Sequence, residues 1–110
     1  MPIKTIAVSL AAALVFSTGV SSAADLAAGQ AKVKEICQAC HGMDGNSSNA
    51  DYPRLGGQYP DYMAKALRDY KSGARKNAIM LGFAQGLTRQ DIDNVAAYYA
   101  SQSAVLVTRH

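Results

Sequence analysis

The stretch from Glu35 to Asn46, EICQACHGMDGN, contains both cysteines of the 110-residue chain, Cys37 and Cys40, with His41 directly after the second. Only two residues separate the thiols. A disulfide between them would close so small a loop that it would remove little entropy from the unfolded chain. The spacing therefore indicates a functional group rather than a structural bridge.

Three functional roles are known for a pair of this spacing. A thioredoxin-type redox pair belongs beside a strand in a βαβ unit, and no strand pattern precedes Cys37. A zinc site needs about four ligands, whereas the only histidines are His41 and His110. The sequence C-x-x-C-H is the attachment signature of c-type haem, in which two thiols bond to one porphyrin and the imidazole reaches the iron. The motif predicts one covalent haem c per chain, attached through Cys37 and Cys40, with His41 as a metal ligand.

Residues 1–24 have the features of a cleavable secretory signal peptide. Lys4 supplies an early positive charge, an apolar run extends from Ile6 to Phe16, and small residues lead to Ala24. The apolar run is shorter than the about 20 residues that a membrane-spanning helix needs. We expect cleavage after Ala24, with Ala23 as the alternative, followed by export to the periplasm and no transmembrane segment in the mature chain.

The expected mature chain is one domain, residues 25–110. A domain of this size commonly needs a cofactor, a metal or a disulfide as additional support. The whole chain has 11 Lys and Arg against 8 Asp and Glu, so removal of Lys4 leaves a formal charge of +2. The charges form no basic block, which argues against nucleic acid as a partner.

The spacing of apolar residues predicts an all-α chain, because no run alternates with a period of two. Asp25 can cap a first helix that leads into the cysteine motif. Pro60 suits the first turn of a second helix, and Gly73 suits its end. The range 41–58 is rich in Gly, Ser, Asn, Asp and Pro, and we interpret it as a loop.

The last predicted helix begins at Thr88, which together with Asp91 resembles a capping box. Residues 75–88 precede it, and we interpret this range as another loop because it contains Gly82 and Gly86.

Three methionines of the mature chain are candidates for the second axial ligand of the iron. Met43 lies two residues after His41, too close along the chain to reach the other face of a porphyrin. Met63 falls among apolar residues that share one helical face, so core packing explains it. Met80 lies 39 residues beyond His41, and this length of chain is enough to reach the other face of a porphyrin. The alternative role for Met80 is to fill a gap in the core.

These features resemble the small class I c-type cytochromes of bacteria, including single halves of the two-haem periplasmic kind. The resemblance rests on the CQACH motif of residues 37–41 and extends over nearly the whole mature chain. It implies a class I cytochrome c fold, with three to five helices around one covalent haem and with the first and last helices crossing. The family places its distal methionine just before the C-terminal helix, so the resemblance implies His41/Met80 ligation.

Pro53 and the helix crossing also match the family. Pro53 lies twelve residues after His41, where the family has a proline whose carbonyl accepts the proton on the histidine's second nitrogen. A simple turn role is the alternative for Pro53. At the crossing of the first and last helices, the family has a small and an apolar residue on the first helix, which correspond to Gly29 and Val33. The apolar and aromatic partners on the last helix correspond to Val95 and Tyr98.

The chain departs from the family pattern because it has no tryptophan, which in some relatives bonds to a haem propionate. We expect Arg75 to bind a propionate instead, with Gln58, Tyr59 and Arg54 as alternatives.

Two axial ligands would leave no coordination position open for a substrate, so the iron could change its charge but not bind a substrate. The sequence also shows no acid–base pair, triad or phosphate loop. The resemblance thus implies a periplasmic electron-transfer protein, not an enzyme, whose iron cycles between Fe(II) and Fe(III). Its expected partners are redox proteins such as a periplasmic dehydrogenase or reductase, a terminal oxidase or another cytochrome.

Two alternatives stay open for the function. The chain could be a cytochrome subunit that accepts electrons within a periplasmic dehydrogenase complex, for example in sulfur-compound oxidation. If Met80 does not bind the iron, a five-coordinate haem could bind a gas or act as a peroxidase. A monomer or a weak homodimer is expected.

Overall fold

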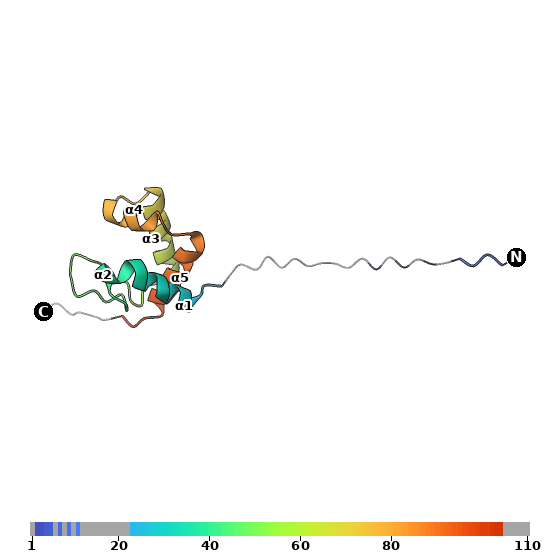
Figure 1. Cartoon of the computed structure of the whole chain (residues 1–110), viewed down its shortest axis with the longest axis horizontal. Coiled ribbons are helices and arrows are strands. Elements are labelled where there is room, and N and C mark those ends of the chain that lie inside the picture. Colours follow the sequence, from blue (N-terminus) through green and yellow to red (C-terminus); the bar gives the residue numbers. More distant parts are fainter. Residues whose placement is uncertain (1, 6, 8, 10, 12–22, 105–110) are drawn as a thin grey trace.

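The computed structural model describes residues 2–5, 7, 9, 11 and 23–104. Most of the expected signal peptide and the range 105–110 therefore lie outside the described residues. From residue 25 to residue 104 the chain forms helices and loops and contains no strand (Figure 1). The all-α prediction is confirmed. No helix in the described ranges combines the length and the apolar character needed to cross a bilayer.

A continuous helical stretch leads into the cysteine motif. It consists of α1 (Leu26–Lys32), the π-helical turn η1 (Val33–Cys37) and α2 (Gln38–His41). Asp25 begins this stretch as predicted, because its carboxylate accepts a hydrogen bond from the backbone N–H of Ala28 at 3.0 Å. The stretch therefore ends with the C-x-x-C-H motif on its last turns.

Two further helices begin where the sequence predicts, and the first of them also ends there. Helix α3 (Pro60–Ser72) has proline in its first turn and ends at Gly73, whose φ of 83° is the left-handed conformation that glycine tolerates. Helix α5 (Arg89–Ala100) begins with a complete capping box, in which Thr88 and Asp91 each accept a hydrogen bond from the other's backbone N–H. Local side-chain chemistry thus sets these boundaries.

The interpretation of residues 75–88 as a loop is wrong for half of that range. Helix α4 (Ala78–Ala84) lies there and carries Met80. The side chain of Asn77 starts this helix by accepting hydrogen bonds from the backbone N–H groups of Ile79 and Met80, each at 3.0 Å. A good N-cap and tertiary contacts outweigh the modest cost of one glycine within a helix.

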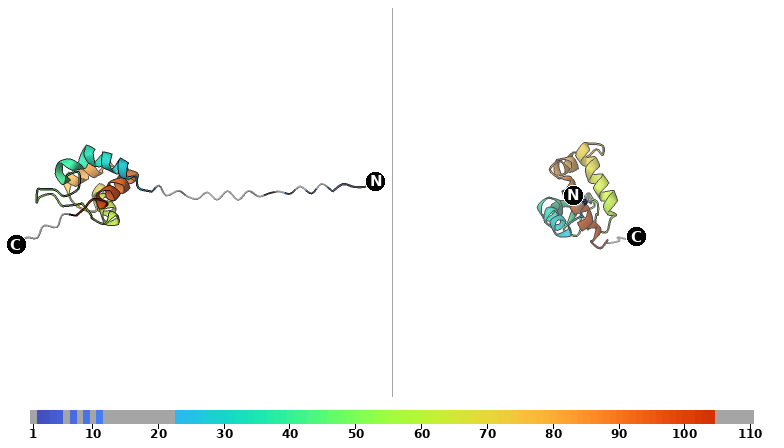
Figure 2. Two further views of the ribbon diagram at one scale, coloured as in Figure 1. Left: turned by 90° about the horizontal axis from the view of Figure 1, so that it is seen from below. Right: turned by 90° about the vertical axis from the view of Figure 1, so that its right-hand side faces the viewer.

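Helix α5 packs against both α1 and α3, and α4 packs against α3 (Figures 1 and 2). The α1–α5 crossing is close at Gly29, where a Cβ atom would lie 2.1 Å from the backbone oxygen of Asn94. Val33 and Val95 are buried near this crossing, with 0% and 3% of their surface exposed. The predicted crossing of the first and last helices is confirmed.

Candidate functional site

A cavity of about 290 Å³ opens between the end of the first helical stretch, α3, α4 and the loop of residues 42–58. Its walls are largely aliphatic and aromatic. The lining includes all of the residues predicted to bind haem: Cys37, Cys40, His41, Pro53, Arg75 and Met80. The tertiary structure thus brings side chains from distant parts of the chain to one apolar cavity.

His41 is buried, and its Nδ1 atom lies 2.9 Å from the carbonyl oxygen of Pro53. Because a carbonyl can only accept, Nδ1 donates, and the lone pair of the imidazole is on Nε2. Nε2 makes no hydrogen bond to the described residues, and none of their buried side-chain nitrogens lacks a partner. Nε2 is therefore not fully buried, and His41 lines the cavity. This is the tautomer that a metal-binding histidine needs.

Cys37 and Cys40 lie one helical turn apart and both line the cavity as free thiols. Burial raises the pKa of the Cys37 thiol to about 11, against the opposing effect of Lys32. Cys37 is therefore a neutral thiol at physiological pH. Two free thiols beside an imidazole with an open Nε2 match the donor set that a covalently attached haem would need, and the apolar walls would suit a porphyrin.

Two methionines line the cavity, and they differ in how deeply they are buried. Met63 on α3 is 5% exposed and belongs to the hydrophobic core, as predicted, although it also borders the cavity. Met80 on α4 lies outside the fully buried core and is partly exposed. Met43 packs against the core and is not part of the lining.

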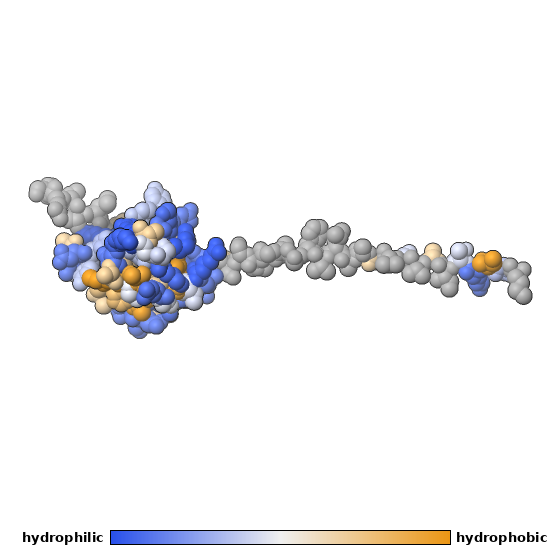
Figure 3. Space-filling model, turned by 90° about the horizontal axis from the view of Figure 1, so that it is seen from above, coloured by the Kyte–Doolittle hydropathy of each residue, from blue (hydrophilic) through white to orange (hydrophobic). Residues whose placement is uncertain are grey.

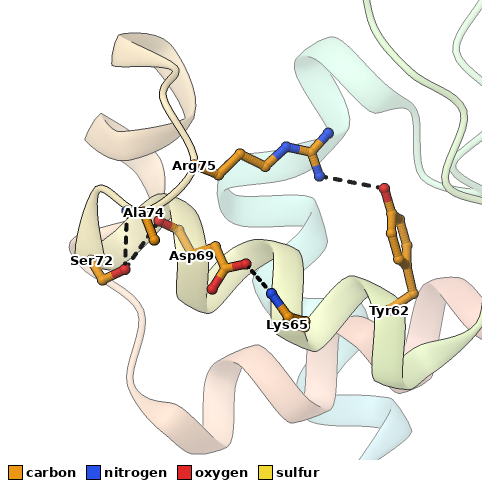
Figure 4. Close-up of polar contacts among 6 residues, drawn as sticks. All are labelled: Tyr62, Lys65, Asp69, Ser72, Ala74 and Arg75. Carbon is orange, nitrogen blue, oxygen red and sulfur yellow. Dashed lines mark hydrogen bonds and ion pairs between the residues drawn. The ribbon is translucent and has the colours of Figure 1, made fainter.

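Arg75 lies at the edge of the cavity and is held by two tyrosines of α3. Its Nη1 atom donates to the hydroxyl of Tyr62 at 3.4 Å (Figure 4). Its guanidinium also lies over the ring of Tyr70, 4.9 Å from the centroid. The hydrogen bond to Tyr62 is the main cause that raises the pKa of Arg75. A fixed positive charge therefore borders an apolar cavity.

The three alternatives to Arg75 differ in position. Gln58 and Arg54 also belong to the lining of the cavity. Tyr59 is 79% exposed and does not.

Tyr99 on α5 also lines the cavity, although it is not among the residues that the sequence predicts to bind haem. It is 1% exposed, and its hydroxyl donates to the carbonyl oxygen of Gly42 at 2.9 Å. Burial is the main cause that raises the pKa of Tyr99, so the hydroxyl stays protonated. The sequence offers only a weak signal here, because two adjacent tyrosines on an amphipathic helix are typical of ordinary core packing.

Large apolar side chains remain exposed around the cavity. Tyr62, Ile79 and Phe83 line it and are 53%, 65% and 43% exposed. Figure 3 shows apolar residues interspersed with polar ones on the face of the domain seen in that view. The cavity therefore opens on a surface that is not uniformly polar.

The sequence matches the family described as cytochrome c over residues 26–103. Cytochrome c4 of Pseudomonas aeruginosa is 48% identical over 86 residues, which cover 77% of this chain and 42% of that protein. Cytochrome c-554(548) of Halomonas halodenitrificans is 45% identical over 83 residues, which cover 73% of this chain and 99% of that protein.

The cytochrome subunit of sulfide dehydrogenase from Chlorobaculum tepidum is 40% identical over 67 residues, which cover 61% of this chain and 60% of that protein. The crystal structure of reduced recombinant cytochrome c4 from Pseudomonas stutzeri superposes with a TM-score of 0.68 at 42% identity, over 74% of this chain and 47% of that one. The chain thus spans less than half the length of these cytochrome c4 relatives.

Proposed function

Because this chain belongs to the cytochrome c family, we propose that it carries electrons between redox proteins through one haem c. The haem supplies reversible one-electron chemistry between Fe(II) and Fe(III). One observation carries the proposal: the two thiols, the imidazole of His41 and the thioether of Met80 line the same apolar cavity. In this assignment Cys37 and Cys40 hold the porphyrin, and His41 and Met80 bind the iron.

The surroundings of His41 support its role as the proximal ligand. The carbonyl oxygen of Pro53 accepts the Nδ1 proton, so the ring is held in one orientation and Nε2 keeps its lone pair. A hydrogen bond of this kind also makes the imidazole a stronger electron donor. Pro53 therefore acts through its backbone oxygen, and the loop around it is part of the site.

Arg75 is the group that we assign to a haem carboxylate. Its guanidinium is already oriented by Tyr62 and Tyr70, so little side-chain entropy remains to be lost on binding an anion. Arg75 also lines the cavity, whereas Tyr59, one of the alternatives, does not.

Visible spectroscopy of the haem-loaded protein, with and without carbon monoxide, tests the ligand assignment. We expect the native ferric protein to show the weak far-red sulfur-to-iron band, and the native ferrous protein not to bind carbon monoxide. Met80→Ala should lose the band and bind carbon monoxide, because a coordination position opens. Met63→Leu, the matched control on α3, should behave as the native protein does.

Other outcomes would reassign the site. Loss of the band in Met63→Leu but not in Met80→Ala would make Met63 the ligand. Ready binding of carbon monoxide by the native ferrous protein would favour the gas-binding or peroxidase alternative over the electron carrier.

The second candidate is a cytochrome subunit that receives electrons within a dehydrogenase complex. The 40% identity to the sulfide dehydrogenase subunit supports it, as do the exposed Tyr62, Ile79 and Phe83 around the cavity. A free carrier docks through a small, transient interface, whereas a permanent subunit buries a larger and more apolar one. Size-exclusion chromatography of the protein isolated from its native host distinguishes them: a free carrier elutes as a monomer or weak homodimer, and a subunit elutes with its dehydrogenase.

The proposed location is the periplasm. The composition of residues 1–24 supports export, with a basic start, an apolar run and small residues before Asp25. The proposed partners are accordingly redox proteins of that compartment, and the proposed role is that of a carrier rather than an enzyme.

A further inference from the structure

Tyr99 connects the C-terminal helix to the backbone that carries His41. Its hydroxyl donates to the carbonyl oxygen of Gly42, the residue directly after His41, across 57 positions of sequence. The N–H of Gly42 donates in turn to the carbonyl of Gln38 at 2.9 Å. Both backbone polar groups of Gly42 are therefore bonded, and the turn that follows His41 is held from two sides.

The same tyrosine also fixes the loop that orients the imidazole. The backbone oxygen of Tyr99 accepts a hydrogen bond from the N–H of Gly57 at 3.0 Å. At Gly45 the loop lies so close that a Cβ atom there would be 2.8 Å from Cδ1 of Tyr99. Pro53, whose carbonyl accepts the His41 proton, lies in this loop between Gly45 and Gly57.

We propose that Tyr99 is a positioning residue for the proximal histidine, holding the backbone of His41 through its hydroxyl and the Pro53 loop through its ring and carbonyl. This rests on the haem site proposed above. Packing alone needs only the aromatic ring, whereas the contact to Gly42 needs the hydroxyl. Removing the hydroxyl separates the two roles.

The effect of the hydroxyl has a definite sign. If the turn after His41 loosens, the hydrogen bond between His41 and Pro53 is held less well, and the imidazole becomes a weaker donor. A weaker donor stabilises the ferric state less. Loss of the hydroxyl should therefore shift the haem iron towards the ferrous state.

The test compares Tyr99→Phe with Tyr98→Phe in the haem-loaded protein. Tyr98 is also buried, lies 5.7 Å from Tyr99 between ring centroids, and makes no hydroxyl hydrogen bond to the described residues. At a fixed ambient potential we expect Tyr99→Phe to raise the ferrous-to-ferric ratio roughly two- to tenfold, the range set by one hydrogen bond. The g-values of the low-spin ferric signal should also change, because they report how the axial ligand is held.

A third form covers the case in which Tyr99→Phe does not accumulate with haem. Replacement of Tyr99 by 3-fluorotyrosine keeps the ring and the hydroxyl but makes the proton more acidic, so the hydrogen bond to Gly42 strengthens. The ferrous-to-ferric ratio should then move in the opposite direction. An unshifted ratio and unchanged g-values in the fluorotyrosine form would overturn the proposal.

Two further outcomes are informative. If Tyr99→Phe and Tyr98→Phe lose thermal stability equally and neither changes the ratio or the g-values, Tyr99 is only a core residue. A native chain that takes up no haem would instead overturn the haem site itself, so the two failures are distinguishable.

Discussion

At the scale of single residues, Gly29 shows how one missing side chain permits the fold. The helix α1 would be more stable with alanine there, because glycine within a helix costs about 0.5–1 kcal/mol relative to alanine. The crossing with α5 outweighs that preference, since a Cβ atom at Gly29 would lie 2.1 Å from the oxygen and 2.7 Å from the carbon of the Asn94 carbonyl. Those are backbone atoms that cannot rotate away.

We expect Gly29→Ala to lower the free energy of unfolding by about 2 kcal/mol, in the range typical of an overpacked core. Gly82→Ala on α4 is the matched control, because no atom lies within 4 Å of a Cβ at that position. The control should gain about 0.5–1 kcal/mol from helix propensity. Denaturant unfolding of the haem-loaded variants, followed by circular dichroism, measures both values. Equal stability of Gly29→Ala and the native protein would mean that the crossing is looser than the structure shows.

At the scale of elements, one carboxylate contributes half of the capping box that starts α5. Asp91 accepts a hydrogen bond from the N–H of Thr88 at 2.9 Å, and this bond is the main cause that lowers the pKa of Asp91. A carboxyl group whose pKa is lower in the folded chain than in the unfolded chain stabilises the fold at pH values above its unfolded pKa. That contribution disappears as the pH falls through the lowered folded value.

Asp91→Ala should therefore destabilise the protein by about 1 kcal/mol at neutral pH, the usual effect of losing a cap. The difference from the native protein should shrink as the pH falls below the ordinary carboxyl pKa of 3.8. Asp93→Ala is the control, because the side chain of Asp93 makes no hydrogen bond or ion pair within the described residues. Thermal unfolding of the haem-loaded variants between pH 3 and pH 7 (chosen to span that value) checks the trend. A difference that stays constant over this interval would contradict the role of Asp91.

Helix α4 is short, and its cap determines how firmly Met80 is held. The helix has 7 residues, and Asn77 binds its first free N–H groups. A helix of this length is marginal without such support. The position of Met80 should therefore respond to a change at Asn77, although Asn77 is not a proposed ligand.

Asn77→Ala should loosen α4 and raise the fraction of ferrous protein that binds carbon monoxide roughly fivefold, as a cap worth about 1 kcal/mol would predict. Asn77→Asp keeps a side-chain acceptor for the N–H groups of Ile79 and Met80 and should behave as the native protein does. Titration with carbon monoxide provides the measurement. If all three forms bind equally little, α4 is held by its packing against α3 rather than by its cap.

At the scale of the whole molecule, the first helix begins directly after the expected cleavage point. Asp25 caps α1, and its N–H donates to Oδ1 of Asn94 on α5 at 2.8 Å. Ala23 and Ala24 are exposed and form no helix. Cleavage between Ala24 and Asp25 would therefore keep the side-chain cap of α1 and the hydrogen bond from Asp25 to Asn94.

We expect the exported protein to begin at Asp25. The new amino group at Asp25 can still donate to Asn94, so the folded domain should lose no stability on processing. Mass spectrometry and N-terminal sequencing of the protein from the periplasmic fraction check this prediction. A periplasmic form that begins before Ala23, or the absence of the chain from that fraction, would contradict it.

The sequence alone determined the features that depend on neighbouring residues. The C-x-x-C-H motif predicted haem c. The caps Asp25 and Thr88 and the first-turn proline Pro60 predicted where three helical stretches begin. These predictions succeed because capping and covalent attachment act over a few positions of chain. The family resemblance added the crossing of α1 with α5, which the structure confirms.

Only the tertiary structure decided the features that join distant residues. Helix α4 forms where two glycines predicted a loop, because Asn77 and the surface of α3 support it. Tyr99 meets Gly42 across 57 positions, and no local pattern distinguishes it from the adjacent Tyr98. Such contacts depend on how the helices pack, since the free energy that selects them comes from surfaces that meet only in the folded chain.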